Sequence, residues 1–142
     1  MDLESVSADA FGRSLQGIGL NLLCRDVRAM TRFMRAAFGV AVHRESADFA
    51  IVTHRGMMLQ LHSDATFGAH PLHGLLPEAP PRGCGVQIYL FGIDPDIACA
   101  RAEAAGGMVI EAPADKPHGL REATILAPEG YALSPAIALA AQ

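Results

Sequence analysis

Polar side chains of this 142-residue chain recur at alternate positions of apolar, strand-like segments. Gln60 and His62 are two residues apart, and so are Gln87 and Tyr89. Because side chains alternate between the two faces of a strand, each pair shares one face. An imidazole can act as a general base near neutral pH, and amide and phenol groups can hydrogen-bond an organic ligand. The spacing therefore predicts a polar binding surface, with a solvent-facing position at the strand end as the alternative for His62.

Two more residues are candidates for the same surface. Asn21 shares a predicted strand face with Gly19. Glu122 lies in a further apolar segment and can act as a base if its side chain points inward. A charged residue in a strand more commonly faces water, so both orientations of Glu122 stay open.

The elements that position these residues occur twice. Asp26 and Gly39 are thirteen residues apart, and so are Asp94 and Gly107. Each Asp follows an apolar run and is placed to cap a helix, and each Gly ends a helical stretch. Later in each half, a similar segment follows a glycine, namely residues 56–61 and 130–135. A duplicated module commonly encloses a cleft between its copies, so a cleft is the expected functional site.

These patterns predict one domain over residues 17–142, after a polar lead-in of residues 1–16. The domain contains two modules, residues 17–63 and 85–138, which a Pro-, Gly- and His-containing linker over residues 64–84 joins. Within the first module we expect a strand over residues 17–24 and a helix over residues 27–38.

The composition excludes several classes of protein. Half of the residues are apolar and the net charge is −4, without a basic cluster, so neither disorder nor nucleic-acid binding is expected. The apolar runs are too short for a bilayer helix, and the acidic N-terminus lacks the features of a signal peptide. Three cysteines, an odd number, favour reduced thiols. We therefore predict a cytoplasmic protein with no membrane or nucleic-acid partner.

Several stretches, in order and with matching spacing, make the chain resemble the vicinal-oxygen-chelate superfamily of glyoxalases, bleomycin-resistance proteins and extradiol dioxygenases. They are residues 20–27, 33–39, 58–61, 86–94, 118–123 and 128–131. The resemblance covers nearly the whole chain. It implies an α+β fold of tandem βαβββ modules, with a curled mixed sheet that forms an open cup. It also implies a ligand in the cup, often over a divalent metal, and a homodimer whose cups are built within one chain or from swapped halves.

The resemblance also indicates where metal ligands would lie. Relatives place His, Gln or Glu at positions that correspond here to Gly19, Gln60, Gln87 and Ser134. Gly has no side-chain donor, and neutral amides and hydroxyls are weak ligands for a divalent ion. We therefore expect no metal cofactor. His118 precedes Gly119 in a loop that borders the cup mouth in relatives, which makes it a candidate acid–base residue beside His62.

The favoured interpretation is a small-molecule-binding protein that sequesters an organic ligand, as bleomycin-resistance proteins do. The expected ligand-binding residues are Asn21, Gln60, His62, Gln87, Tyr89, Glu122 and Ser134. One alternative is a glyoxalase-like lyase or a dioxygenase-like enzyme, with a metal site rebuilt around His62 or with metal-free acid–base chemistry. Another alternative is a dimeric regulatory or interaction module with a vestigial cup.

Overall fold

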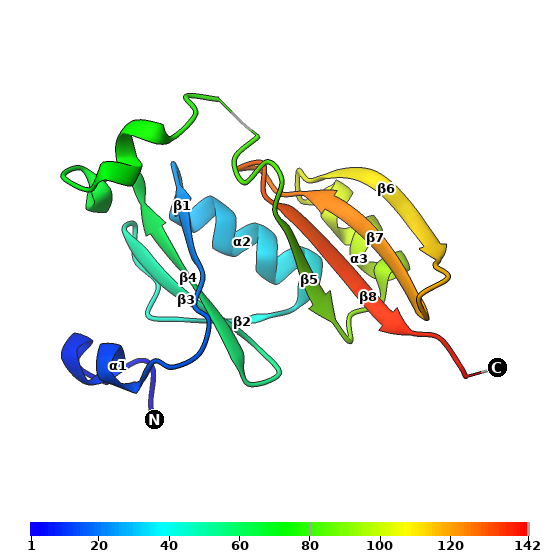
Figure 1. The fold of residues 1–142 in the computed structure, drawn as a ribbon, viewed down its shortest axis with the longest axis horizontal. Helices are drawn as coiled ribbons and strands as arrows, with labels where there is room; N and C mark the ends of the chain where they lie inside the picture. The colour runs from blue at the N-terminus through cyan, green and yellow to red at the C-terminus, as the bar shows by residue number, and fades with distance from the viewer. Residues whose placement is uncertain (80, 142) are drawn as a thin grey trace. The chain divides into compact units, whose positions relative to one another are not determined.

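The computed structural model describes residues 1–79 and 81–141 and has two four-stranded mixed sheets with helices (Figure 1). Its elements, in chain order, are α1 (Ala8–Ser14), β1 (Asn21–Cys24), α2 (Val27–Phe38), β2 (Ala41–His43), β3 (Phe49–His54), β4 (Met57–Ser63), the 3₁₀ helices η1 (Asp64–Phe67) and η2 (Pro71–Leu75), β5 (Gln87–Phe91), α3 (Pro95–Ala104), β6 (Met108–Asp115), β7 (Leu120–Leu126) and β8 (Ala132–Ala138). The predicted α+β class with two βαβββ modules is confirmed.

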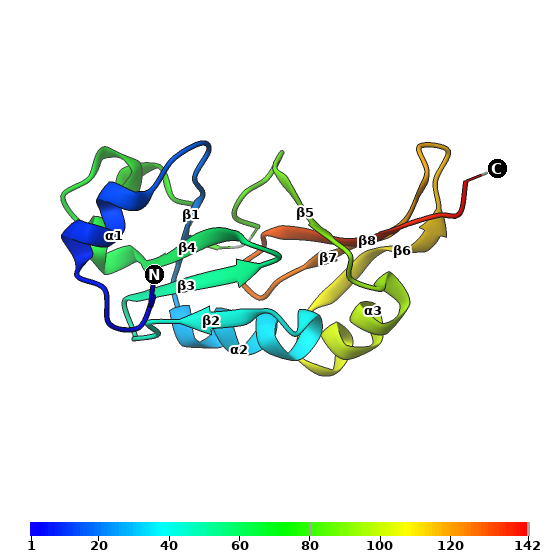
Figure 2. The same ribbon diagram turned by 90° about the horizontal axis from the view of Figure 1, so that it is seen from below.

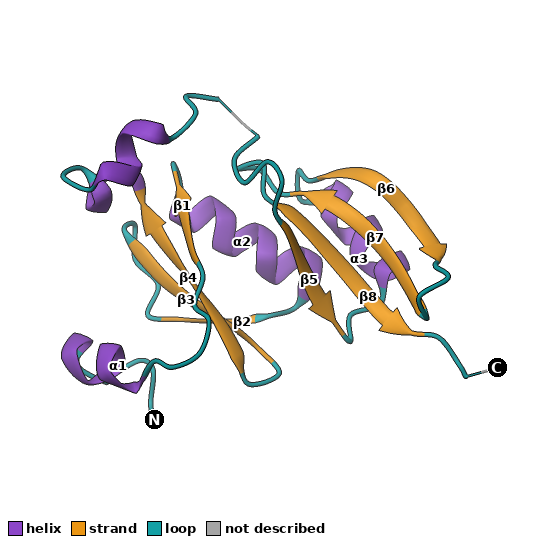
Figure 3. Cartoon of the chain, in the orientation of Figure 1, coloured by secondary structure: helices purple, strands orange, loops and turns teal. Residues whose placement is uncertain are grey.

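The two sheets have the same topology. Sheet A has the strand order β1-β4-β3-β2, and sheet B has the order β5-β8-β7-β6. In each sheet the first and last strands of the module are parallel, and the other neighbours are antiparallel. Figure 3 shows the repeated succession of one strand, one helix and three strands. The duplication inferred from the spacing of the sequence is therefore a duplication of topology.

The helix limits follow from local chemistry. The Asp26 carboxylate accepts a hydrogen bond from the backbone N–H of Ala29 (3.0 Å) at the start of α2, and Gly39 after its end has a φ of 64°. Asp94 caps α3 by accepting from the N–H groups of Asp96 (2.8 Å) and Ile97 (3.3 Å). The predicted helix over residues 27–38 and both predicted caps are confirmed.

The prediction of a strand over residues 17–24 is wrong in its first half. Strand β1 begins at Asn21, and the preceding Ile18 is 97% exposed. Gly17 has a φ of 78°, which no extended strand adopts, and glycine weakens a strand because it has no side chain to pack. Leu23 on the expected polar face is buried, so apolar side chains occupy both faces of β1.

The chain divides into two compact units, each with its own core. Unit 1 comprises residues 1–31 and 40–75, and unit 2 comprises residues 32–39 and 76–142. In sheet A of unit 1, cross-strand partners Leu22, Leu61 and Ala50 form a buried apolar row. The predicted module limits, residues 17–63 and 85–138, stay predictions.

Unit 2 repeats this arrangement with a helix on one face of its sheet. Ile88, Leu133 and Ile125 are cross-strand partners in sheet B, and all three are buried. Helix α3 packs on β6, β7 and β8, and Figure 2 shows it along one face of the sheet. Its small buried residues, Ala98 and Ala102, allow close approach to the strands. The opposite face of sheet B is not covered by α3, and polar side chains can lie there.

Among the residues that the structure describes, no helix combines the length and the apolar character that a bilayer crossing requires. Cys24 and Cys99 are buried and Cys84 is exposed, and none of the three is part of a disulfide.

Candidate functional site

A connected set of polar side chains lies on sheet B. Tyr89 and Ser134 are cross-strand partners on β5 and β8. The Gln87 side-chain amide donates a hydrogen bond to Ser134 Oγ (2.9 Å), and Thr124 Oγ1 on β7 lies 3.0 Å from the same oxygen. Ser134 is fully buried. Three strands therefore contribute to one hydrogen-bonded row, with the hydroxyl of Ser134 at its centre.

The carboxylate of Glu122 on β7 extends this row. Its side chain is only 6% exposed, which decides the orientation that the sequence left open. Glu122 Oε1 lies 3.3 Å from His118 Nε2, and the His118 side chain is 53% exposed. Among the described residues, Glu122 Oε2 has no hydrogen-bond partner. Unit 2 thus brings together five predicted site residues, namely Gln87, Tyr89, His118, Glu122 and Ser134.

The charges on this face interact with one another. Interaction of the Tyr89 hydroxyl with the Glu122 carboxylate raises the pKa of that phenol, with burial adding to the rise and Gln87 opposing it. Lys116 Nζ forms an ion pair with Glu111 Oε1 (2.9 Å), which raises the pKa of the lysine; Glu122 adds to that rise. The face therefore carries two carboxylates beside one ammonium group.

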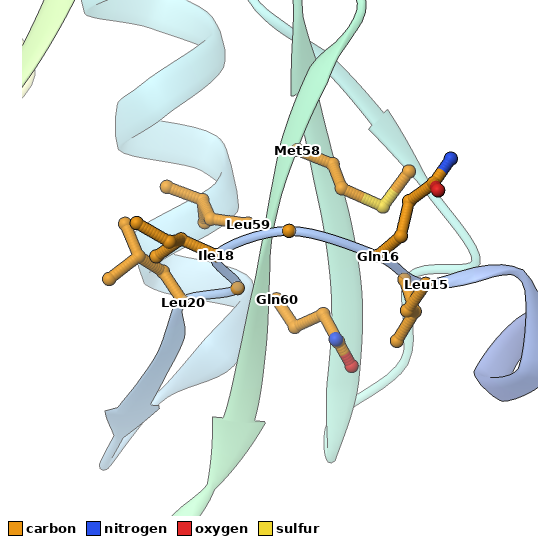
Figure 4. Close-up of a pocket in the computed structure, with 9 residues that line it drawn as sticks. Leu15, Gln16, Ile18, Leu20, Met58, Leu59 and Gln60 are labelled. Atoms are coloured by element: carbon orange, nitrogen blue, oxygen red, sulfur yellow. The ribbon is translucent and has the colours of Figure 1, made fainter.

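Unit 1 holds the remaining candidates, Asn21, Gln60 and His62, and of these Gln60 lines a small pocket. Asn21 and Gln60 are cross-strand partners on β1 and β4. The pocket has a volume of about 160 Å³, and Gly19 and Gln60 both line it. Figure 4 shows the Gln60 and Met58 side chains extending from β4 to the same side. Ligand pockets usually measure about 300–1,000 Å³, so this one alone accommodates only part of an organic molecule.

His62 occupies an aromatic cluster. Its ring packs edge-on against Phe49 (5.0 Å between ring centroids) and Phe67 (5.3 Å), and Phe67 also contacts His70 (4.9 Å). Burial lowers the pKa of His62 because the cluster disfavours the charged imidazolium. The His62 ring thus packs sheet A against the η1 segment. The predicted catalytic and ligand-binding roles of His62 stay predictions.

The lowered pKa of His62 predicts how stability depends on pH. The folded state binds the His62 proton more weakly than the unfolded chain, so the free energy of unfolding falls as the pH drops below about 6.5. We expect urea midpoints measured between about pH 8 and about pH 5 to fall less in His62→Gln than in the wild-type protein. His73→Gln, at an exposed position of η2, is the control. Equal pH slopes in all three proteins would contradict this account.

The donors at the superfamily's metal positions do not fit a divalent cation. Gly19 supplies no side chain, although a Cβ there would meet no atom within 4 Å. In unit 2, Gln87 and Ser134 hydrogen-bond to each other, and Thr124 engages Ser134 as well. Neutral amides and hydroxyls that already satisfy one another are poor ligands for such an ion. Across residues 1–79 and 81–141, moreover, no three His, Cys, Asp or Glu side chains are grouped to hold a metal.

Sequence reasoning missed Thr124 and Lys116 as neighbours of the site. Thr124 is two residues from Glu122 on β7, so strand alternation was a usable signal for it. Lys116 lies in the β6–β7 turn, and only the fold brings its side chain near Glu122.

Comparison with known proteins supplies the family context. A family model described as a glyoxalase-like domain matches residues 18–134. A search of curated proteins finds no match to the chain.

Solved structures resemble this fold over most of its length. A glyoxalase/bleomycin resistance protein/dioxygenase family enzyme from Burkholderia phytofirmans PsJN has a TM-score of 0.70 and 20% identity, covering 84% of this chain and 96% of its own. A glyoxalase/bleomycin resistance protein/dioxygenase from Nocardioides has a TM-score of 0.64 and 21% identity, with 94% of each chain covered. TioX from Micromonospora sp. ML1 has a TM-score of 0.61 and 18% identity, covering 89% of this chain and 99% of its own. At these identities the likeness extends to the fold alone.

Proposed function

This chain belongs to the family of glyoxalase-like domains, within the vicinal-oxygen-chelate superfamily, and we propose that it sequesters a small organic molecule without a divalent metal. The proposal includes a homodimer in the cytoplasm, and light scattering of the purified protein tests the dimer. Exposed apolar side chains at Ile18 and Val86 are the surfaces that a second copy could cover.

The observation that supports this proposal is the hydrogen-bonding face of sheet B. It offers an amide, a phenol, an imidazole and a carboxylate within one unit, at Gln87, Tyr89, His118 and Glu122. These groups suit the mixed donors and acceptors of an organic molecule. Gln87 and Ser134, two of the residues at the family's metal positions, in contrast hydrogen-bond to each other.

The test combines metal analysis with ligand binding. We expect protein purified without chelator to contain less than one metal ion per chain, and we expect at least one compound of a metabolite and antibiotic panel to raise Tm. A ligand at about 100 times its Kd stabilises the folded state by about 2.7 kcal/mol, which is a shift of several degrees for a domain of this size. Mass spectrometry should then recover the compound unchanged. A stoichiometric metal bound by Gln60, Gln87 or Ser134 would overturn the metal-free proposal, and a panel without any shift would remove the support for binding.

A metal-free acid–base enzyme is the second candidate. The contact of 3.3 Å between His118 Nε2 and Glu122 Oε1 favours it, because a carboxylate can orient an imidazole that transfers protons. The two candidates differ in one readout. Chemical conversion of the bound compound over time, lost in His118→Gln, would favour the enzyme over sequestration.

A further inference from the structure

One oxygen of the Glu122 carboxylate lacks a hydrogen-bond donor among the described residues. Oε1 contacts His118, whereas Oε2 is buried and has no hydrogen-bond partner among the described residues. A buried carboxylate oxygen without a donor has lost water without replacement, which destabilises the folded state. A ligand that brings a donor to Oε2 would recover that loss.

The fold itself does not require a carboxylate at this position. Aligning strands β4 and β8 on Gly56 and Gly130 makes His62 the counterpart of Ala136, and the cross-strand partners of these two residues on β3 and β7 are Phe49 and Glu122. Unit 1 therefore builds the same place in its sheet with an aromatic side chain. The acid at Glu122 is consequently better explained by binding than by folding.

The neighbouring charges favour a cation. The groups around Glu122 are the Tyr89 hydroxyl from β5, Glu111 from β6, and Lys116 and His118 from the β6–β7 turn. Lys116 is already paired with Glu111 at 2.9 Å. With His118 neutral, the cluster keeps one uncompensated negative charge, which a cationic ligand would neutralise.

An aromatic platform lies across the sheet from this carboxylate. The rings of Tyr89 and Phe91 are stacked, with centroids 4.9 Å apart and planes 5° apart, and Phe91 is 54% exposed. Phe91, Ala136 and Glu122 are successive cross-strand partners on β5, β8 and β7. Because neighbouring strands are about 4.8 Å apart, the backbones of Phe91 and Glu122 are about 10 Å apart, which one aromatic ring with an amidine substituent can bridge.

We propose that this face of sheet B binds a planar organic cation with adjacent N–H donors, of the amidine or guanidine class. One N–H donates to Glu122 Oε2, and the plane of the ligand stacks on the outer face of the exposed Phe91 ring, which is itself stacked on Tyr89. Because Oε2 is buried, neighbouring side chains must move for the N–H to reach it, and the half-exposed His118 beside Oε1 is one that can. The inference rests on the proposed small-molecule binding and names the ligand class for it.

The experiment compares three probes of one shape. Benzamidinium, neutral benzamide and anionic benzoate are titrated into the wild-type protein by calorimetry. We expect benzamidinium to bind at least about tenfold more tightly than benzamide, since charge-assisted hydrogen bonds to a buried carboxylate are the stronger ones, and benzoate to bind most weakly. Amide resonances of β7 and β8 should shift with benzamidinium, which locates the site without any variant.

Two variants assign the preference to one carboxylate. Glu122→Gln keeps the size of the side chain and removes its charge, so the preference for benzamidinium should disappear. Glu103→Gln removes an equal charge from an exposed position of α3, and this variant should keep the preference for benzamidinium.

Four other outcomes of these titrations would contradict the cation site. Equal binding of benzamide and benzamidinium, resonance shifts elsewhere, or a preference that survives in folded Glu122→Gln would overturn the cation site. None of these results contradicts the proposed sequestration of a small molecule, which other compounds of the metabolite and antibiotic panel would still support by raising Tm. Absence of benzamidinium binding overturns the inference as well.

Discussion

Gly130→Ala is expected to lower the free energy of unfolding by about 2–5 kcal/mol, from backbone strain and overpacking together. Gly130 has a φ of 91°, a conformation that a residue with a Cβ rarely adopts. A Cβ there would also overlap the backbone, since it would lie 2.6 Å from the N atom of Arg82 and closer still to Pro81 Cα. Backbone atoms cannot rotate away as a side chain can. Urea denaturation of the purified variant measures the effect.

Gly85→Ala separates the two contributions to this loss. Gly85 has the same φ of 91°, but a Cβ there would meet no atom within 4 Å. It should therefore lose only the strain, about 1–2 kcal/mol. If the two variants were equally stable, the packing of residues 81–82 against the turn at Gly130 would not be correct.

Leu133→Ala is expected to cost about 2–5 kcal/mol, the usual range for a fully buried leucine. Leu133 is on β8, an inner strand of sheet B, between Ile88 and Ile125. Its side chain is completely buried, and α3 closes the core of unit 2. The cavity would be enclosed by elements on several sides, so little relaxation could fill it. Thermal and urea unfolding with an unchanged m-value would report the loss as a stability effect.

Ile110→Ala is the matched control for this cavity. Ile110 lies on the edge strand β6 and is 53% exposed, so its truncation should cost at most about 1 kcal/mol. A cost for Leu133→Ala no greater than that of Ile110→Ala would mean that sheet B does not pack around Leu133 as described.

Most of the fold could be predicted from the sequence because its signals are local. Asp26 and Asp94 cap helices through their own side chains, and Gly39 ends α2 through its own backbone freedom. The strand over residues 17–24 failed for a local reason too, since Gly17 adopts a positive φ that an apolar alternation cannot reveal. Gln87 and Tyr89 beside Ser134 could be named in advance, whereas Thr124 was missed and the hydrogen bonds to Ser134 could not be predicted.

The sequence by itself determined the duplicated order of strands and helices, since spacing, capping and side-chain periodicity act over a few residues. Only the tertiary structure decided that Glu122 is buried and that residues 81–83, predicted as part of a linker, pack on the turn that contains Gly130 and on Tyr131. Period two assigns a residue to one of two faces and does not say what covers that face. What covers a face depends on segments distant in sequence, and at Glu122 it leaves one carboxylate oxygen buried without a hydrogen-bond partner among the described residues.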